Sequence, residues 1–167
     1  MTKDIVLVVA NVRSAHNVGS MLRTADGLGI KRVYLCGYTP YPLAKKDTRL
    51  PHISKAADSK IHKTALGAEE SVAWIHEDDV KEAISKLKTQ KYIIACLEQT
   101  PRSLPLPAFR LKNSKIALVV GSEIGGIDDT ILKTADICLE IPMSGQKESF
   151  NVSLAAAIAL YHLKHLA

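Results

Sequence analysis

The sequence has few cysteines and no long apolar run, and it shows no internal repeat and no low-complexity tract. Its three cysteines are odd in number, widely spaced and set in apolar runs; they are Cys36, Cys96 and Cys138. This pattern indicates neither a disulfide framework nor a metal-binding knuckle. No segment approaches the ~20 apolar residues that a membrane-spanning helix needs. These absences argue against a disulfide-stapled or membrane-spanning protein.

The amino-terminal residues run directly into the apolar segment Ile5–Ala10. This segment is too short and wrongly flanked to be a signal peptide. We therefore expect a cytoplasmic protein whose cysteines are buried strand thiols, with no membrane partner and no metal.

Length and composition fit one globular domain. The chain has 167 residues, of which 47% are hydrophobic and 23% are charged. These values are typical of a soluble domain that is large enough to bury a full core, and we expect a single domain over residues 1–167. The formal net charge of +5 favours a polyanionic partner, because lysine and arginine that neutralise phosphates release counterions.

Apolar runs of strand length alternate with helical patterns along the chain, which is typical of βαβ units. The predicted fold class is α/β, with a largely parallel sheet flanked by helices. The expected strands are Ile5–Ala10, Arg32–Cys36, Ser71–Ile75, Tyr92–Leu97, Lys115–Val120 and Ile137–Ile141. The expected helices run from about Val18 to Leu28 before Gly29, from Asp78 or Asp79 to about Thr89, from a cap at Asp128, and from about Asn151 to Leu166.

Two proline-containing segments interrupt this alternation. Gly37–Lys63 carries three prolines and six lysine or arginine residues. We interpret it as a long irregular surface segment of the kind that carries function. Thr100–Lys112 carries three further prolines and is expected to link two halves of the domain.

Three polar loops follow expected strands, at the edge where open α/β sheets bind ligands. They span Asn11–Arg23, Gly121–Ile127 and Ile141–Ser153. The second loop is rich in glycine, which lets the backbone approach a ligand closely. It lacks the Gly-Lys-Ser/Thr ending of a phosphate-binding loop, so it does not indicate a nucleotide triphosphate site.

Each polar loop also has a plain structural explanation. In the first loop, Asn17 could cap a helix while Arg23 is a solvated charge. In the second, Glu123 could be exposed in a glycine turn. In the third, Ser149 or Asn151 could cap the last helix.

Taken together, the three loops resemble the three signature motifs of the TrmH family of SPOUT-class RNA methyltransferases. The resemblance rests on Asn-x-Gly-x-x-x-Arg-Thr-Ala-Asp from Asn17, Gly-Ser-Glu-x-x-Gly from Gly121, and Ile-Pro-Met followed by Ser-x-Asn-Val-Ser from Ile141. The motifs stand in the family's order and span nearly the whole chain. The resemblance implies methylation of a ribose 2′-hydroxyl in tRNA or rRNA with S-adenosylmethionine as cofactor. It also implies a trefoil knot in the carboxyl-terminal third of the fold.

The resemblance further implies roles for ten residues. Those expected to line the cofactor pocket are Leu97, Gly121, Ile141, Met143 and Phe150. Those expected to form the catalytic cluster are Asn17, Arg23, Glu123, Ser149 and Asn151. The family usually has leucine where this chain has Phe150, so the packing around adenine is expected to differ in detail.

Methylation of a ribose requires the 2′-hydroxyl oxygen to lie in line with the sulfonium methyl and to lose its proton as the bond forms. The family is thought to use the arginine of its first motif, here Arg23, as the base or as a bridge to the substrate phosphate. A free guanidinium keeps its proton at ordinary pH, so we assign to Arg23 the positioning of phosphate and hydroxyl. No metal is needed, because the sulfonium already activates the methyl group.

Two further features indicate partners. Lys45, Lys46 and Arg49 are expected to contact RNA phosphates, since short members of the family lack a separate RNA-binding domain. The last helix is apolar on nearly every side over Val152–Ile158, so one of its faces should meet a second copy of the chain. We therefore expect a homodimer whose RNA spans both subunits.

Two other functions compete with this one. A base-methylating SPOUT relative would carry a different third motif, so the presence of Ser149 and Asn151 argues against it. A non-catalytic RNA-binding or assembly module with the same fold would not need Arg23 and Glu123 in addition. Cofactor binding separates this last alternative from an enzyme.

Overall fold

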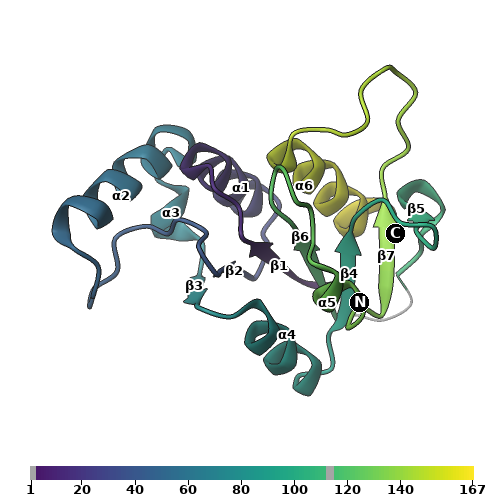
Figure 1. Cartoon of the computed structure of the whole chain (residues 1–167), viewed down its shortest axis with the longest axis horizontal. Helices are drawn as coiled ribbons and strands as arrows, with labels where there is room; N and C mark the ends of the chain where they lie inside the picture. The colour runs from purple at the N-terminus through teal and green to yellow at the C-terminus, as the bar shows by residue number, and fades with distance from the viewer. Residues whose placement is uncertain (1–2, 112–114) are drawn as a thin grey trace.

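A parallel sheet of seven strands forms the centre of the computed structural model, which describes residues 3–111 and 115–167 (Figure 1). Within those residues the strand order is β3-β2-β1-β6-β4-β7-β5, and every pairing is parallel. The strands are β1 (Asp4–Ala10), β2 (Arg32–Cys36), β3 (Trp74–Glu77), β4 (Ile93–Leu97), β5 (Leu104–Pro105), β6 (Lys115–Val120) and β7 (Ile137–Glu140). The predicted α/β class and parallel sheet are confirmed.

Helices cover both faces of this sheet. They are α1 (Ala15–Gly27), α2 (Pro51–Ala65), α3 (Ala68–Ser71), α4 (Val80–Thr89), η1 (Leu106–Ala108), α5 (Asp129–Leu132), α6 (Val152–Tyr161) and η2 (His162–Leu166). On one face lie α1, α3 and α6, with α2 packed on α1, whereas α4 and α5 cover the other face. In the part of the chain that the structure describes, no helix is long and apolar enough to cross a membrane.

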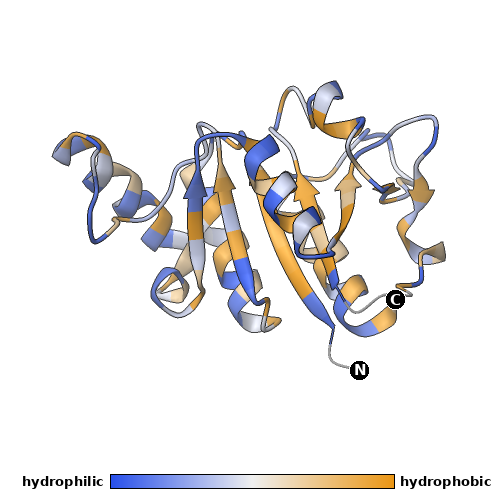
Figure 2. Ribbon diagram, turned by 90° about the horizontal axis from the view of Figure 1, so that it is seen from below, coloured by the Kyte–Doolittle hydropathy of each residue, from blue (hydrophilic) through white to orange (hydrophobic). Residues whose placement is uncertain are grey.

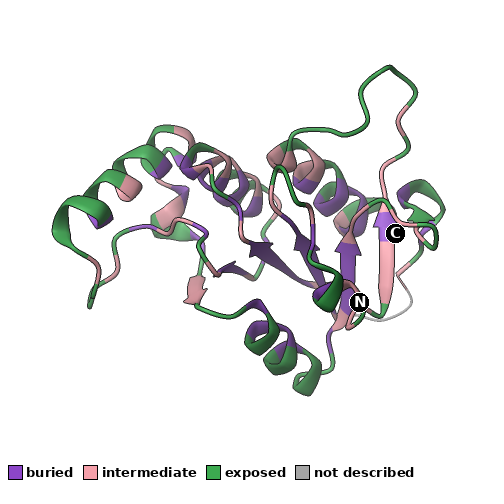
Figure 3. Ribbon diagram, viewed as in Figure 1, coloured by how far each residue is buried: buried purple, intermediate pink, exposed green. Residues whose placement is uncertain are grey.

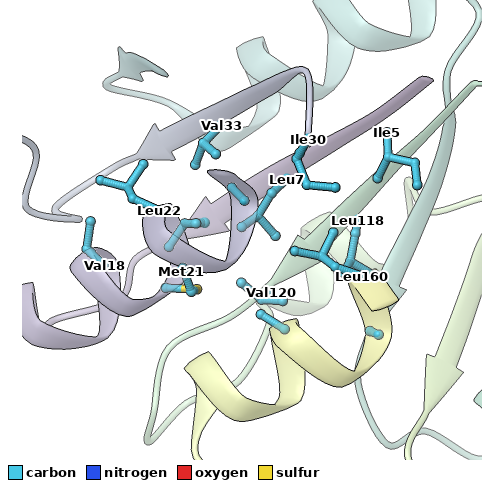
Figure 4. Close-up of a cluster of buried hydrophobic side chains, with 14 of the residues drawn as sticks. Ile5, Leu7, Val18, Met21, Leu22, Ile30, Val33, Leu118, Val120 and Leu160 are labelled. Carbon is cyan, nitrogen blue, oxygen red and sulfur yellow. The ribbon is translucent and has the colours of Figure 1, made fainter. Parts of the chain in front are cut away.

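The alternation of side chains along the strands separates two apolar cores. In β1, Ile5, Leu7 and Val9 face the core beneath α1 and α6, whereas Val6 and Val8 face α4. Both sets are almost fully buried, because a parallel strand with helices on both sides has no solvated face. Figure 2 shows the apolar strands and Figure 3 their burial. In Figure 4, side chains of α1 and α6 meet those of β1 and β6.

The cysteines belong to these strands. Cys36 and Cys96 are buried and Cys138 is partly buried. Burial raises the pKa of the Cys36 and Cys96 thiols to about 12. They therefore stay protonated and unreactive near neutral pH, which agrees with the prediction of buried strand thiols.

The strand register places several polar loops along one edge of the sheet. Val9 of β1 pairs with Val120 of β6, and Leu97 of β4 pairs with Leu139 of β7. The loops that follow β1, β4, β6 and β7 consequently start side by side, although they lie far apart in the sequence. This is the edge at which the sequence predicted a ligand site.

Side-chain caps define where the helices begin. Ser14 rather than Asn17 caps α1, since the Ser14 hydroxyl accepts a hydrogen bond from the Asn17 backbone amide at 3.2 Å. The interpretation of Asn17 as a helix cap is therefore wrong, and its side chain is free for another role. Asp79, Asp128 and Asn151 cap α4, α5 and α6, as the sequence predicted.

The prediction that Gly37–Lys63 is irregular is wrong in its second half, where the helix α2 lies. A proline suggests a break, but Pro51 stands in the first turn of α2, where a backbone N–H has no partner within the helix. The apolar stripe of α2 is also weak, because only three of its residues are buried (Figure 3). So few buried positions leave little periodicity to detect.

The predicted strand Ser71–Ile75 begins too early. The structure continues the helix α3 to Ser71 and starts β3 at Trp74. Glu69 and Glu70 stand in the first turn of α3, where carboxylates interact favourably with the helix dipole. This local preference outweighs the β propensity of the residues that follow.

The segment Thr100–Lys112 is more than a linker. Within it, β5 pairs with β7 at the edge of the sheet and the short helix η1 follows, with Leu106 buried in the core. Lys112 itself lies outside the described residues. The prolines that suggested a linker suit an edge strand, which does not need every backbone donor.

Helix α6 keeps an exposed apolar side in the single chain. Ala156, Ala159 and Leu160 are fully buried, but Leu154 and Tyr161 are 56% and 53% exposed. The fold thus covers one side of the helix and leaves the other uncovered. The trefoil knot that the resemblance implies stays a prediction.

Candidate cofactor and substrate site

A cavity of about 360 Å³ lies at the carboxyl edge of the sheet, between the loops that follow β4, β6 and β7 and the start of α6. Its volume is in the range of small-molecule sites. The residues predicted to bind the cofactor all line it: Leu97, Gly121, Ile141, Met143 and Phe150. Segments that are far apart in the sequence thus form a single cavity.

The glycine loop after β6 is tightly closed on itself. Ser122 and Gly126 form an isolated β-bridge, and their backbone groups exchange hydrogen bonds of 3.0 and 3.1 Å. A Cβ atom on Gly121 would lie 2.3 Å from the backbone of Gly126, which has a φ of +62°. Both positions therefore require glycine. The Glu98 carboxylate holds the far end of the loop, where Oε2 accepts a hydrogen bond from the Ile127 amide at 2.9 Å.

Glu123 reaches from this loop to the start of α1. Its Oε2 accepts a hydrogen bond from the Arg13 amide at 3.1 Å, and its Oε1 accepts hydrogen bonds from the Ser14 amide at 3.2 Å and from Asn17 Nδ2 at 3.0 Å. Burial alone would raise the pKa of the Glu123 carboxyl, but these hydrogen bonds outweigh it and lower the pKa below its usual value. Glu123 is therefore a carboxylate at neutral pH. It lies exposed in the glycine turn, as one interpretation of the sequence expected, and its hydrogen bonds also fix it to the start of α1.

Asn17 continues this contact to the third motif. Its Oδ1 accepts a hydrogen bond from Asn151 Nδ2 at 3.3 Å. The Oδ1 of Asn151 at the same time caps α6 through the Ser153 amide at 2.9 Å. Capping and participation in the cluster are thus compatible for Asn151. The result is a continuous chain, Glu123–Asn17–Asn151, at the rim of the cavity, with Ser149 also in the cavity lining.

Arg23 lies apart from this cluster. It is six residues beyond Asn17 on α1, which corresponds to about 9 Å along the helix axis and roughly 120° around it. Its exposed side chain borders an open hollow between α1 and α2, together with Ser20, Thr24, Lys63 and Thr64. Among the described residues it has no hydrogen bond or ion pair. Four of the five predicted catalytic residues therefore lie together. The fifth, Arg23, is on α1 like Asn17 but on an adjacent face of that helix.

The cavity is acidic although the chain as a whole is basic. Four glutamates are among its lining residues: Glu98, Glu123, Glu140 and Glu148. No lysine, arginine or histidine occurs among the described residues that line it. Such a site favours a ligand that carries positive charge over a free phosphate. In the described residues, no group of three or more His, Cys, Asp or Glu side chains is arranged to hold a metal ion.

The predicted RNA-binding residues divide into two kinds. Lys45 and Lys46 are exposed in a turn. Arg49 instead pairs with Asp47 at 2.5 Å and donates hydrogen bonds to the Tyr41 and Pro42 carbonyls, both at 3.0 Å. Its guanidinium also stacks 3.5 Å from the centre of the Tyr41 ring. The prediction that Arg49 contacts phosphate is therefore corrected, because its donors already hold the loop together.

Several residues at this edge went unnoticed in the sequence. Glu98 and Gln99 follow β4 directly and line the cavity. The rule that ligands bind beyond the carboxyl ends of parallel strands would have pointed to them. Arg13 and Ser14 contribute through backbone amides, which any residue other than proline provides, so no sequence signal marks them.

Comparison with known proteins agrees with this geometry. The model of the SpoU rRNA Methylase family matches residues 4–161. The chain belongs to this family. The TrmH-type resemblance seen in the three motifs is thereby confirmed.

Similar proteins include methyltransferases of two RNA classes. A tRNA (guanosine(18)-2′-O)-methyltransferase from Borreliella burgdorferi is 27% identical over 162 residues, which are 97% of this chain and 66% of that protein. An AdoMet-bound rRNA methyltransferase from Sinorhizobium meliloti has the same fold, with a TM-score of 0.78 at 19% identity over 96% of this chain and 56% of that one. A structure described as giving insights into the 2-OH methylation of C/U34 on tRNA matches with a TM-score of 0.71 at 21% identity, over 96% of this chain and 93% of that one.

The chain spans between 54% and 66% of the length of the first curated relatives that it matches. In the structure that it covers at 93%, the match extends over nearly the whole of both chains. The fold of the methyltransferase domain therefore occurs both alone and within longer proteins.

Proposed function

We propose that this chain transfers a methyl group from S-adenosylmethionine to a ribose 2′-hydroxyl in tRNA or rRNA. The observation that carries the proposal is the chain Glu123–Asn17–Asn151 at the rim of a cavity of cofactor size. The three residues come from three separate motifs and meet only in the folded protein. If these residues only capped helices or lay in solvent-exposed loops, they would not need to be linked by hydrogen bonds.

The residues of the cavity fit S-adenosylmethionine. The cofactor carries a sulfonium cation, and the cavity presents four glutamates and no cationic side chain among its described lining residues. Leu97, Ile141 and Met143 offer apolar contacts for an adenine ring, and the Gly121 loop brings backbone groups to the cavity wall. When bound, the cofactor supplies a methyl group that is already activated for transfer.

The protein's own residues then have to place the ribose. Glu123 is held by the amides of Arg13 and Ser14, so it fixes the Asn17 side chain relative to the cavity. Asn17 and Asn151 present amide groups at the rim, where they can hold ribose hydroxyls in line with the methyl group. Arg23 carries a permanent charge about 9 Å further along α1, at a distance suited to the phosphate beside that ribose.

We also propose that the active form is a homodimer and that RNA contacts both subunits. The exposed apolar side of α6 supports a second copy as partner. The cavity opens beside the amino-terminal end of α6, so the two sites of a dimer formed through this helix would lie near the interface. Two neighbouring subunits would offer RNA a longer surface than one chain does.

Calorimetry with S-adenosylmethionine tests the proposal first. We expect saturable binding in the micromolar range, because the cavity is preformed and of suitable size. Incubation with tRNA and rRNA and labelled cofactor should then yield 2′-O-methylated nucleosides by mass spectrometry. The absence of any binding heat at millimolar cofactor would contradict the proposal, and methyl groups on bases alone would identify a base-methylating enzyme.

Charge reversal at Lys45 and Lys46 tests the RNA-binding loop. The double substitution to glutamate should weaken RNA binding, and the slope of log affinity against log salt should fall by roughly 0.7 to 0.9 for each lost phosphate contact. Arg49 is left in place because it stabilises the loop. The matched control replaces Lys81 and Lys133, exposed residues of the opposite face, with the same change of charge. Equal losses in both variants would mean that only net charge matters.

A further inference from the structure

The loops that follow β1 and β2 are joined by a buried threonine. Thr39 is 2% exposed, and its hydroxyl contacts the Cys36 carbonyl at 2.7 Å and the Val9 carbonyl at 3.2 Å. The same oxygen accepts a hydrogen bond from the Val12 amide at 3.1 Å. The hydroxyl therefore satisfies backbone groups of both loops and fixes their relative position.

Two residues of the same junction have left-handed backbone. Asn11 has a φ of +57° and Gly37 a φ of +64°. A Cβ atom on Gly37 would lie 2.0 Å from Asn11 Oδ1, which accepts a hydrogen bond from the Tyr38 amide at 3.3 Å. Glycine and asparagine are the residues that adopt the left-handed region most readily, so both positions suit this tight junction. The junction thus fixes the backbone at Tyr38.

This junction presents an aromatic ring to solvent. Tyr38 is 57% exposed and stacks on no other aromatic ring among the described residues. The guanidinium of Arg13 lies 5.9 Å from the centre of its ring, at the outer limit of a cation–π contact. A rigid support under an exposed tyrosine is not explained by packing, since the ring contributes little to either core.

The ring also adjoins the proposed catalytic cluster. The backbone amide of Arg13 donates to Glu123, which lines the cofactor cavity, while the Arg13 side chain faces Tyr38. Tyr38 is thus linked through Arg13 to the carboxylate that holds Asn17 in the proposed ribose site. Exposed aromatic rings beside arginine are surfaces on which unpaired bases of RNA stack.

We propose that Tyr38 and Arg13 form a platform on which an unpaired base of the RNA stacks while its phosphate contacts the guanidinium. The inference rests on the proposed function only in taking RNA as the substrate. Sequence-tolerant stacking at this point would hold the strand, and the cluster at the cavity would select the ribose. The platform thus makes single-stranded or flipped-out nucleotides the preferred target.

The test compares two fluorescein-labelled probes of about twelve nucleotides, one an oligoadenylate and the other an abasic ribose-phosphate strand, in anisotropy titrations. Tyr38→Leu should weaken binding of oligoadenylate by about 5- to 150-fold and leave binding of the abasic strand unchanged. Tyr38→Phe should bind both probes like the wild type, because the ring remains. Arg13→Gln, which keeps the backbone amide on Glu123, should lower the salt slope by roughly 0.7 on both probes.

Three results would overturn the platform: unchanged oligoadenylate affinity in Tyr38→Leu, an equal loss on both probes, or a change of oligomeric state without a change of RNA affinity. The last would assign Tyr38 to a protein contact. The thermal unfolding midpoint of each variant, measured in parallel, separates loss of stacking from loss of fold. A wild type that binds oligoadenylate through Tyr38 but transfers no methyl group would refute the proposed function and leave the platform standing.

Discussion

Replacement of Arg23 by alanine should reduce the rate of RNA methylation by about 10²-fold, the loss that follows when a group that positions the substrate is removed. Affinity for S-adenosylmethionine should stay close to that of the wild type, because Arg23 does not line the cofactor cavity. Single-turnover kinetics with saturating RNA and calorimetry with the cofactor measure the two effects separately. Stability should change little, since the side chain is exposed and makes no ion pair among the described residues.

The substitution Arg23→Lys is the matched variant. It keeps the charge but not the planar fork that binds a phosphate through two parallel hydrogen bonds, so it should not restore the rate. Lys63→Ala, in the same hollow between α1 and α2, serves as a positional control. A parallel loss of cofactor affinity in Arg23→Ala would show that the residue acts at the cavity and that its assigned role is wrong.

Most of the strands and helices could be predicted from the pattern of apolar residues in the sequence. The buried strands read as continuous apolar runs because helices cover both faces, and Asp79, Asp128 and Asn151 mark helix starts through their own side chains. The helix α2 could not be predicted from apolar patterning, because it packs on α1 rather than on the sheet and buries few residues. Pro51 gave no further help, because proline is common both in the first turn of a helix and in loops.

The residues of the site could be predicted from the sequence, but the contacts between them could not. The motifs identify Asn17, Glu123 and Asn151, but their hydrogen bonds join residues more than a hundred positions apart, which no local pattern reveals. Arg49 illustrates the opposite error, because composition counts its charge and only the structure reveals its contacts with Asp47 and Tyr41. A charged side chain is available to a ligand only where no other group of the protein already pairs with it.

Introduction of aspartate at Leu154 or Ile158 should separate the proposed homodimer into monomers. These residues are 56% and 39% exposed in the single chain, and Ile158 lines an apolar groove between α6 and η1. Burial of an unpaired carboxylate costs at least about 3 kcal/mol, and two-fold symmetry applies this cost twice, so the dissociation constant should rise by about 10⁴-fold. Sedimentation equilibrium at micromolar concentration measures the change. Ile53→Asp, at an exposed isoleucine of α2, is the matched control and should remain dimeric.

The same substitutions should also impair the cofactor site, because one residue belongs to both surfaces. Ile141 lines the cofactor cavity on one side and the apolar groove on the other. A partner seated in the groove would therefore fix Ile141 against the cofactor, and its removal should weaken cofactor binding together with dimerisation. The coupling is reciprocal, so saturating S-adenosylmethionine should tighten the dimer by the same factor. A monomeric Leu154→Asp variant with undiminished cofactor affinity would disprove the coupling, and one with full methylation activity would disprove the need for a dimer.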